Sequence, residues 1–343
     1  MLAGACTVSG ADRAPEALIE HYGAADRERV GRLVAASRAA GTSRAYRSRL
    51  NDWRRWCEDR GLEPDEALSD KAIAAYIGDR HADGQAARTL GLAVAALRFA
   101  CRTTGRGVAD GPRTRYALQG ARRLDAGAER PLPSLRREHV EDVIRGIEAE
   151  ATEAEDGSSK ALAATRDAAI LAAAADAMLR ISEVAALDVE DLAIEPDGSG
   201  RIRIRRSKTD QFGRGAVQYV PPATVARLAA WIEAAGIENG GPLWRGVSRW
   251  GKAGDARTAK RYIQRVIRER CEAAGFPGIT CHALRRGTAE SLTLSGAPLT
   301  EVMRAGRWRR AEMPLLYTQA VDAADGAIAR FHGAARGAER AGG

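Results

Sequence analysis

Two short pairs of charged side chains have the types and the spacing that chemistry on a phosphate group requires. His282 and Arg285 lie three residues apart, as do Arg180 and Glu183, so each pair shares one face if its segment is helical. Arginine donates paired hydrogen bonds to phosphate oxygens and stays charged at any working pH. These arginines and the histidine, gathered with Lys208 around one phosphate, would favour the additional negative charge of a pentacoordinate transition state.

A tyrosine near the end of the chain completes this set. The hydroxyl of Tyr317 would be the nucleophile of a phosphoryl transfer, and Trp308 lies nine residues before it. Each element taken alone has an ordinary structural explanation. A histidine–arginine pair or a lysine at a hairpin is usually solvated, an arginine–glutamate pair is usually a helix ion pair, and a single tyrosine usually belongs to a core or an interface. The order along the chain is what favours a catalytic site.

The first part of that order resembles the tyrosine recombinase (phage integrase) family. The run from Met178 to Leu192, which contains Arg180-Ile-Ser-Glu183, is similar to the family's first arginine box. Ser207-Lys-Thr-Asp is similar to the segment that carries the family's hairpin lysine, so Lys208 takes that position.

The second part of the order resembles the remaining boxes of the same family. His282-Ala-Leu-Arg285 is similar to the second box, and Gly306-Arg-Trp308 followed by Tyr317 is similar to the last. Trp308 stands where many members have histidine. Cre-like members resemble this chain in having tryptophan there. The specific motifs cover roughly residues 135–320, and a looser resemblance to the family's core-binding domain covers 15–130.

The resemblance implies a role for each residue of the strand-cutting step. Tyr317 would attack a backbone phosphate in line, leaving a 3′-phosphotyrosyl bond and a free 5′-hydroxyl. Arg180 and Arg285 would hold the non-bridging oxygens, and His282 would help to move the tyrosine proton. Arg286 adjoins Arg285, but only Arg285 lies three residues after His282.

Three further residues have supporting roles in the family pattern. Lys208 would protonate the departing 5′-oxygen, Trp308 would buttress the site by packing, and Glu183 would orient its neighbours. One ester is exchanged for another, so the resemblance implies that neither ATP nor a metal or other cofactor is needed. Gly246 to Ala253 nearly matches a phosphate-binding loop, but Ala253 lacks the hydroxyl that would hold Mg²⁺, so we expect no nucleotide site there.

Composition agrees with a DNA-binding protein but does not establish one. The 343 residues include 53 basic and 45 acidic side chains, for a net charge of +8 and a pI near 9.5. The five cysteines are far apart, and we expect Cys57, Cys101 and Cys271 to be buried thiols of a reduced protein. The sequence suggests neither a membrane span nor a signal peptide, so we expect a cytoplasmic, nucleoid-associated protein.

The hydrophobic pattern predicts a mainly α protein with a small β-hairpin, organised as an N-terminal helical bundle and an α+β catalytic domain. The expected divisions are a disordered 1–15, a core-binding domain over 16–122, a linker over 123–134, the catalytic domain over 135–334 and a disordered tail over 335–343. In the first domain we expect helices around Tyr46 to Cys57, after a capping Ser69, and around Leu90 to Cys101.

In the catalytic domain the expected helices cover 137–149, 161–187, 223–235, 257–274, 283–295, 299–306 and 311–333, with a polar loop over 151–160. Arg201 to Arg206 alternates apolar and basic residues, which predicts a half-exposed strand, and 217–220 is expected to return beside it.

The expected partner is double-stranded DNA, held by both domains in a clamp. The candidate phosphate contacts are Arg44, Arg47, Arg49, Arg205, Arg206, Arg257, Lys260 and Arg261. The resemblance further implies a dimer on one site and a tetramer when two sites meet, with accessory DNA-bending proteins as further partners. The segment after Tyr317 would dock either on a neighbouring subunit or on its own domain, and the sequence leaves both open.

Two other functions use similar residues. A type IB topoisomerase would relax DNA as a monomer, and a catalytically silent regulator would only bind it. The N-terminal region and the Arg180-Ile-Ser-Glu183 box favour a recombinase that integrates, excises or resolves DNA over a topoisomerase. The complete catalytic set argues against a silent regulator. The target site and the choice among these tasks cannot be obtained from the sequence.

Overall fold

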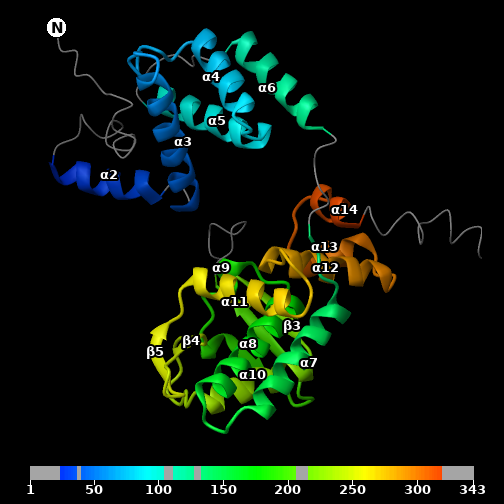
Figure 1. The fold of residues 1–343 in the computed structure, drawn as a ribbon. Helices are drawn as coiled ribbons and strands as arrows, with labels where there is room; N and C mark the ends of the chain where they lie inside the picture. The colour runs from blue at the N-terminus through cyan, green and yellow to red at the C-terminus, as the bar shows by residue number, and fades with distance from the viewer. Residues whose placement is uncertain (1–23, 37–39, 104–110, 127–132, 206–214, 319–343) are drawn as a thin grey trace, which may run out of the picture. The chain divides into compact units, whose positions relative to one another are not determined.

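The computed structural model describes residues 24–36, 40–103, 111–126, 133–205 and 215–318 (Figure 1). The chain divides into two compact units, Met1–Pro131 and Leu132–Gly343, each with its own hydrophobic core. The terminal segments that were expected to be disordered, and residues 127–132 of the linker expected over 123–134, lie outside the described residues.

The first unit is a helical bundle, as the sequence predicts. It contains α2 (Ala24–Ala36), α3 (Ala40–Glu58), α4 (Asp70–Ala82), α5 (Ala87–Thr103) and α6 (Pro112–Asp125). Trp53 of α3 stacks on Trp56 at 5.2 Å and meets the edge of Tyr76 at 5.3 Å between ring centroids. Ser69 caps α4 as predicted, because its hydroxyl accepts a hydrogen bond from the backbone of Ala72 at 3.3 Å. α6 runs to Asp125, three residues past the expected end of this domain.

The second unit is built around one buried helix. The helices α7 (Arg137–Glu153), α10 (Pro222–Ala234), α11 (Lys260–Ala273) and α12 (Cys281–Leu294) pack on α8 (Ser159–Asp176). Almost every residue of α8 from Ala164 to Ala175 is buried, and most are alanines. Small side chains let several helices approach one axis closely, so the alanine-rich sequence explains why α8 is central. The chain continues through α13 (Leu299–Gly306) and α14 (Glu312–Thr318).

Two small antiparallel sheets complete this unit. The first has the order β1 (Leu192–Ile194), β2 (Gly200–Ile204) and β3 (Ala216–Val220), with Arg201 opposite Tyr219. In β2 the isoleucines are buried and the arginines exposed, so the predicted hairpin is confirmed, whereas β1 was not predicted. The second sheet pairs β4 (Arg245–Val247) with β5 (Ala253–Arg257). It replaces the expected start of a helix at residue 257, and it places the near match to a phosphate-binding loop in a hairpin rather than before a helix.

The largest difference from the sequence prediction is a break in the expected helix over 161–187. α8 ends at Asp176, Met178 takes a positive φ of 45°, and a new short helix, α9 (Ile181–Val184), begins after Arg180. The carbonyl groups at this break accept hydrogen bonds from side chains far along the chain. Thr288 donates to Ala175 O at 3.1 Å, and Gln218 donates to Ala177 O at 3.2 Å. The helix ends here because distant donors bind its last carbonyls, and a local hydrophobic pattern cannot report that.

The polar loop expected over 151–160 is shorter than predicted. α7 continues to Glu153, and Ser158 caps α8 by accepting a hydrogen bond from the backbone of Ala161 at 3.1 Å. The prediction that Cys57, Cys101 and Cys271 are buried is confirmed, and Cys281 is buried as well. Within the described ranges, none of the helices combines the length and the apolar composition that crossing a membrane requires.

A glycine of α12 gives a direct test of the packing in the second unit. A Cβ atom at Gly287 would collide with the carbonyl oxygen of Leu135. We expect Gly287→Ala to lower the free energy of unfolding by about 1–3 kcal/mol, because the backbone would have to move apart. Urea unfolding followed by circular dichroism measures this. Gly146 in α7 is the matched control, because a Cβ there meets nothing within 4 Å; Gly146→Ala should raise stability by about 0.5–1 kcal/mol.

Candidate active site

The break after α8 places Arg180 at the start of α9 rather than in the middle of a helix. Arg180 is therefore the residue before the first turn, and Glu183 lies in that turn. One carboxylate oxygen of Glu183 accepts a hydrogen bond from the backbone N–H of Arg180 at 2.9 Å, and the other accepts from the Arg180 guanidinium at 2.7 Å. The expectation that the two residues share a helix face was wrong, although they do contact each other. Glu183 both caps the helix and orients the arginine.

A third arginine, Arg307, was missed by the sequence analysis. It ends α13 with a left-handed backbone, φ 52° and ψ 44°. Its guanidinium donates to Glu183 at 2.6 Å, to Ala177 O at 3.2 Å and to Met178 O at 3.1 Å. It lies inside the Gly306-Arg-Trp308 motif, in which the sequence analysis assigns a role only to the tryptophan. The sequence does contain one indication: Arg307 directly follows a glycine at the end of a predicted helix, where a left-handed backbone conformation is common.

Arg285 is the most deeply buried cation of the site, with 1% of its surface exposed. One terminal nitrogen donates to Met178 O, and the guanidinium carbon lies 4.5 Å from the ring centroid of Trp308. Its Nε and Nη2 find no hydrogen-bond partner among the described residues. Burial, reinforced by repulsion from Arg180 and Arg307, lowers the pKa of Arg285 to about 9. An anion bound at these two free donors would satisfy both the hydrogen bonds and the charge.

Tyr317 lies beside His282, and Trp308 covers one side of the tyrosine. The Tyr317 hydroxyl is 3.0 Å from His282 Nε2, and the Trp308 ring centroid is 5.7 Å from that of Tyr317. Burial raises the pKa of Tyr317, and the positive charges of Arg286, Arg285 and Arg180 oppose that rise. His282 itself is exposed. The pair can therefore pass a proton from the phenol to an imidazole that solvent or a substrate reaches.

Not all the predicted catalytic residues fall within the described part of the chain. The structure brings together Arg180, Glu183, His282, Arg285, Trp308 and Tyr317 around the ends of α8, α9, α12, α13 and α14. Lys208 and Arg206 lie outside the described residues, so their positions stay predictions.

Two of the predicted DNA contacts are held in ion pairs within the second unit. Arg205 bonds to Asp188 at 2.6 Å and to Asp191 at 2.8 Å. Arg257 also pairs with Asp188 and donates to Leu187 O at 2.9 Å, close to the end of α9. These contacts give the two side chains a structural role that the sequence analysis did not foresee. Lys260 and Arg261, by contrast, are exposed in the first turn of α11, where a cation is disfavoured by the helix dipole.

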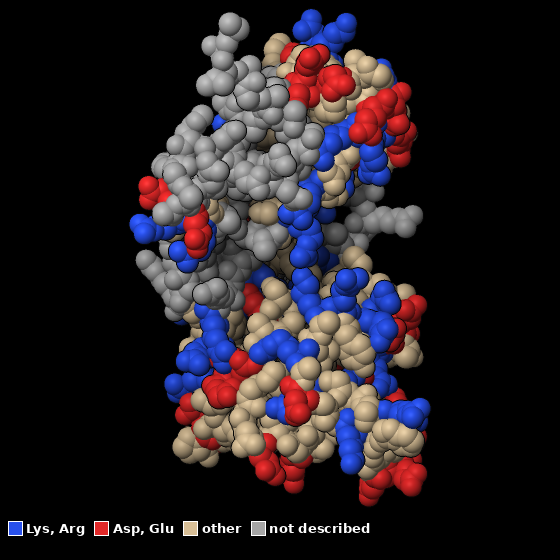
Figure 2. Space-filling view, turned by 90° about the vertical axis from the view of Figure 1, so that its left-hand side faces the viewer, with Lys and Arg blue, Asp and Glu red and all other residues tan. Residues whose placement is uncertain are grey.

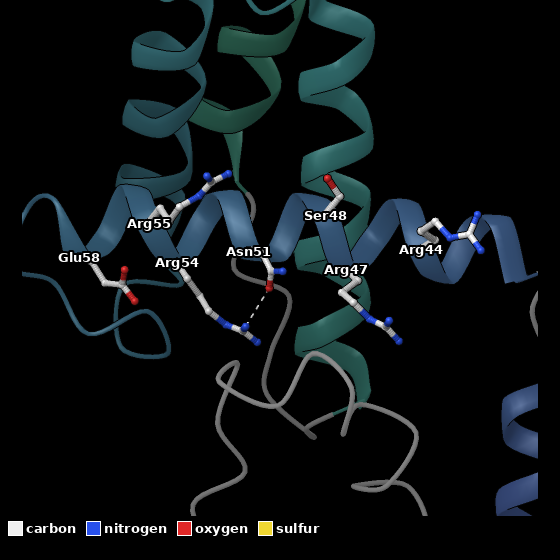
Figure 3. A pocket seen from close by; sticks show the side chains of 7 residues that line it. All are labelled: Arg44, Arg47, Ser48, Asn51, Arg54, Arg55 and Glu58. Atoms are coloured by element: carbon white, nitrogen blue, oxygen red, sulfur yellow. Dashed lines mark hydrogen bonds between the residues drawn. The ribbon is translucent and has the colours of Figure 1, made fainter. Parts of the chain in front are cut away.

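The exposed face of α3 forms a hollow of about 610 Å³ with a basic lining (Figure 3). The lining residues are Arg44, Arg47, Ser48, Asn51, Arg54, Arg55 and Glu58. Two of the predicted phosphate contacts, Arg44 and Arg47, thus lie in one hollow, and Arg54 donates to Asn51 at 2.9 Å. The contact of Arg44 and Arg47 with DNA stays a prediction. Arg49 is not part of this lining: it is half-buried and donates to Ser48 at 3.1 Å. Figure 2 shows basic and acidic side chains interspersed over one face of the second unit.

Comparison with known families identifies both parts of the chain. Residues 145–323 match the phage integrase family, and residues 33–100 match the phage integrase N-terminal SAM-like domain. The chain belongs to the phage integrase family. The predicted resemblance is confirmed, although the assignment of Trp308 to the family's variable position stays a prediction.

The chain is also similar to named recombinases. It is 24% identical over 180 residues to recombinase Cre of Escherichia phage P1, which covers 48% of this chain and 52% of Cre. It is 29% identical over 267 residues to tyrosine recombinase XerC of Mycobacterium sp. (strain KMS), covering 75% and 81% of the two chains. The chain thus spans about half the length of Cre and about four fifths of XerC.

Solved structures share the fold. The XerH recombinase in a post-cleavage complex with its palindromic difH substrate matches with a TM-score of 0.62 at 14% identity, covering 90% of this chain and 86% of XerH. The Tn1549 transposon integrase in complex with transposon right-end DNA matches with a TM-score of 0.59 at 14% identity, covering 95% and 99%. The predicted fold class is confirmed: an N-terminal helical domain followed by a mainly helical catalytic domain with a small sheet.

The left-handed backbone of Arg307 can be tested separately from its side chain. Arg307→Gly and Arg307→Ala both remove the guanidinium, but only glycine adopts φ 52° without a penalty. We expect the alanine variant to be less stable than the glycine variant by about 1 kcal/mol. Chemical denaturation of the two variants measures the difference. Equal stabilities would show that residue 307 does not hold this backbone conformation in solution.

Proposed function

We propose that Tyr317 is the nucleophile of this enzyme and that Arg180 and Arg285 bind the phosphate it attacks. Membership of the phage integrase family makes the chain a tyrosine recombinase, which cuts and rejoins DNA in site-specific recombination. The single observation that supports the residue assignment best is a juxtaposition. The hydroxyl of Tyr317 lies 3.0 Å from His282 Nε2, and the neighbouring Arg285 has two buried donors with no partner among the described residues.

The proposed step exchanges one phosphate ester for another. A lone pair of the Tyr317 oxygen forms the new bond to phosphorus while the bond to the 5′-oxygen breaks, and the phenolic proton passes toward His282. The Arg285 Nε and Nη2 donors and the Arg180 guanidinium bind the non-bridging oxygens, where negative charge grows in the transition state. Lys208 would supply the proton that the departing 5′-oxygen takes up. Glu183 holds Arg180, Arg307 in turn binds Glu183, and neither would touch a reacting atom.

The two alternative functions are not favoured. The named relatives are recombinases rather than topoisomerases, and the chain matches both the phage integrase family and its N-terminal SAM-like domain. A silent DNA-binding regulator would have no use for the paired Tyr317 and His282 or for the unsatisfied donors of Arg285. We therefore retain strand cutting and rejoining as the activity.

DNA is the proposed partner of both units. The α3 hollow with Arg44 and Arg47, together with Lys260 and Arg261 at the start of α11, offers cations that are exposed. A helix start also presents backbone N–H groups to phosphate, which would offset the unfavourable position of these two cations. A dimer on one site, a tetramer when two sites meet, and work on the host nucleoid with accessory DNA-bending proteins complete the proposal.

The assignment of the nucleophile predicts a specific loss. On nicked duplexes drawn from DNA that flanks the gene, the wild type should form a covalent adduct that survives denaturing electrophoresis. We expect Tyr317→Phe to reduce this adduct at least about 1,000-fold, because phenylalanine has no hydroxyl. Salt-sensitive binding of the same duplex by both proteins is the control. Adduct formation by the phenylalanine variant would assign the nucleophile to another residue, and binding without any wild-type adduct would favour the silent regulator.

The α3 hollow predicts a change in the salt dependence of binding. Arg44→Gln and Arg47→Gln should each weaken binding to duplexes of any sequence and reduce the slope of log K against log salt by about 1. Arg49→Gln is the matched control, because Arg49 lies on the same helix but outside the hollow. Fluorescence anisotropy at several salt concentrations measures the slopes. If the Arg44 and Arg47 variants keep the wild-type slope, the hollow does not contact phosphate.

A further inference from the structure

A short segment at the start of the second unit lies tightly along α12. We call residues 133–137 the linker strap. The strap backbone donates from Leu135 N to Ala283 O at 3.4 Å and from Arg137 N to Ser291 Oγ at 3.0 Å, and Ser134 donates to Glu290 at 2.8 Å. Gly287 lies directly against the Leu135 carbonyl, where no larger residue fits. The strap is therefore fixed to the helix that carries His282 and Arg285.

Arg286 lies between this strap and the nucleophile. Its residue surface is 6% exposed, and one terminal nitrogen donates to the carbonyl of Pro133 in the strap. On the other side, its guanidinium carbon lies 5.0 Å from the ring centroid of Tyr317. A guanidinium over an aromatic ring is attracted by the ring quadrupole, and desolvation strengthens the attraction. Arg286 thus connects the strap to the tyrosine through one side chain.

Arg286 differs in its contacts from the other cations near Tyr317. Within the described part of the chain, the titratable groups that act on Tyr317 are His282, Arg285 and Arg286 of α12 and Arg180 before α9. Arg180 and Arg285 have their own contacts in the proposed phosphate site, whereas Arg286 points to the strap and the tyrosine. Among the charges that lower the pKa of Tyr317, that of Arg286 has the largest effect. Glu290, which is near Arg286, bonds to Ser134, and Glu312 of α14 is exposed.

We propose that Arg286 is a positioning residue for the nucleophile: held by the Pro133 carbonyl, it fixes the ring of Tyr317 and supplies positive charge beside its hydroxyl. This inference rests on the proposed role of Tyr317. The strap would then affect the reaction, because a displacement of Pro133 would move the Arg286 guanidinium that contacts Tyr317. The neighbouring Arg285 instead contacts Met178 and Trp308.

The first test needs no DNA. The full-length protein is labelled with tyrosine carrying ¹³C at the ring ζ carbon, and the resonance that Tyr317→Phe lacks belongs to Tyr317. Its chemical shift is followed against pH in the wild type and in Arg286→Gln, Arg286→Met and Arg286→Lys. We expect the ionisation midpoint of Tyr317 to move to higher pH in the Gln and Met variants, because a cation that favours the phenolate is lost, and to lie between these and the wild type in the Lys variant.

A matched control separates this role from a purely structural one. Arg136→Gln removes one positive charge from the strap itself. The Arg136 side chain lies 4.0 Å from Glu290 and pairs with it rather than with Tyr317. We expect the Arg136 variant to leave the Tyr317 midpoint unchanged. If Arg286 only fastens the strap to α12, the Gln and Met variants will unfold more easily while the Tyr317 midpoint stays at the wild-type value, and the proposal is then wrong. The Met variant fills the buried space with an apolar chain, so a folded protein is available if the Gln variant does not fold.

The second test uses the nicked duplexes on which the wild type forms its adduct. We expect Arg286→Gln to form the adduct about tenfold more slowly at neutral pH, the order of one desolvated cation–π contact, and its rate to recover as the pH is raised. A rate equal to the wild type at every pH would contradict the proposal. If the wild type itself forms no adduct, the proposed function fails, but the titration of Tyr317 still decides whether Arg286 acts on it.

Discussion

The site depends on one physical constraint, which is that the carbonyl groups directly after the last turn of α8 are bound by arginine side chains from far along the chain. Arg285 and Arg307 both donate to Met178 O, and Arg307 also donates to Ala177 O. A helix end leaves its carbonyls without partners, and a buried carbonyl without one is costly. The arginines satisfy these groups, and the same contacts fix where the guanidinium groups point. The hydrogen bonds that satisfy the end of α8 are thus the same ones that position the cations of the site.

The same arrangement leaves a local excess of positive charge. Arg180 and Arg307 both pair with the single carboxylate of Glu183, which is almost fully buried, and both repel the neighbouring Arg285. The pKa of Arg285 falls to about 9 as a result of burial and of its two cationic neighbours. A site that holds this charge before its substrate binds needs no reorganisation when a phosphate arrives, and preorganisation of this kind is a main source of catalytic stabilisation. Placing these cations close together lowers the stability of the fold. The close packing of the alanine-rich core around α8 offsets this loss.

Close approaches of the backbone hold the other half of the site. A Cβ atom at Gly306 would overlap the ring of Trp308, so glycine there lets the tryptophan lie against the end of α13 and cover both Arg285 and Tyr317. Gly287 does the same for the linker strap on α12. Tyr317 is only 2% exposed in this setting. Its neighbours therefore control both the orientation of its ring and the ionisation of its hydroxyl.

The sequence by itself determined the types and order of the residues proposed to be catalytic, the alternation of β2, the capping of α4 by Ser69 and the helical character of both units. Each of these is local: a hydroxyl before a helix or an arginine on every second residue is visible within a few positions. The tertiary structure decided the break at Met178, the part of Arg307, the contact between Arg286 and Tyr317, and the ion pairs of Arg205 and Arg257 with Asp188. These rest on hydrogen bonds and charges between residues as far apart as Ala177 and Arg307, and no periodicity along the chain records which distant donor will meet which carbonyl.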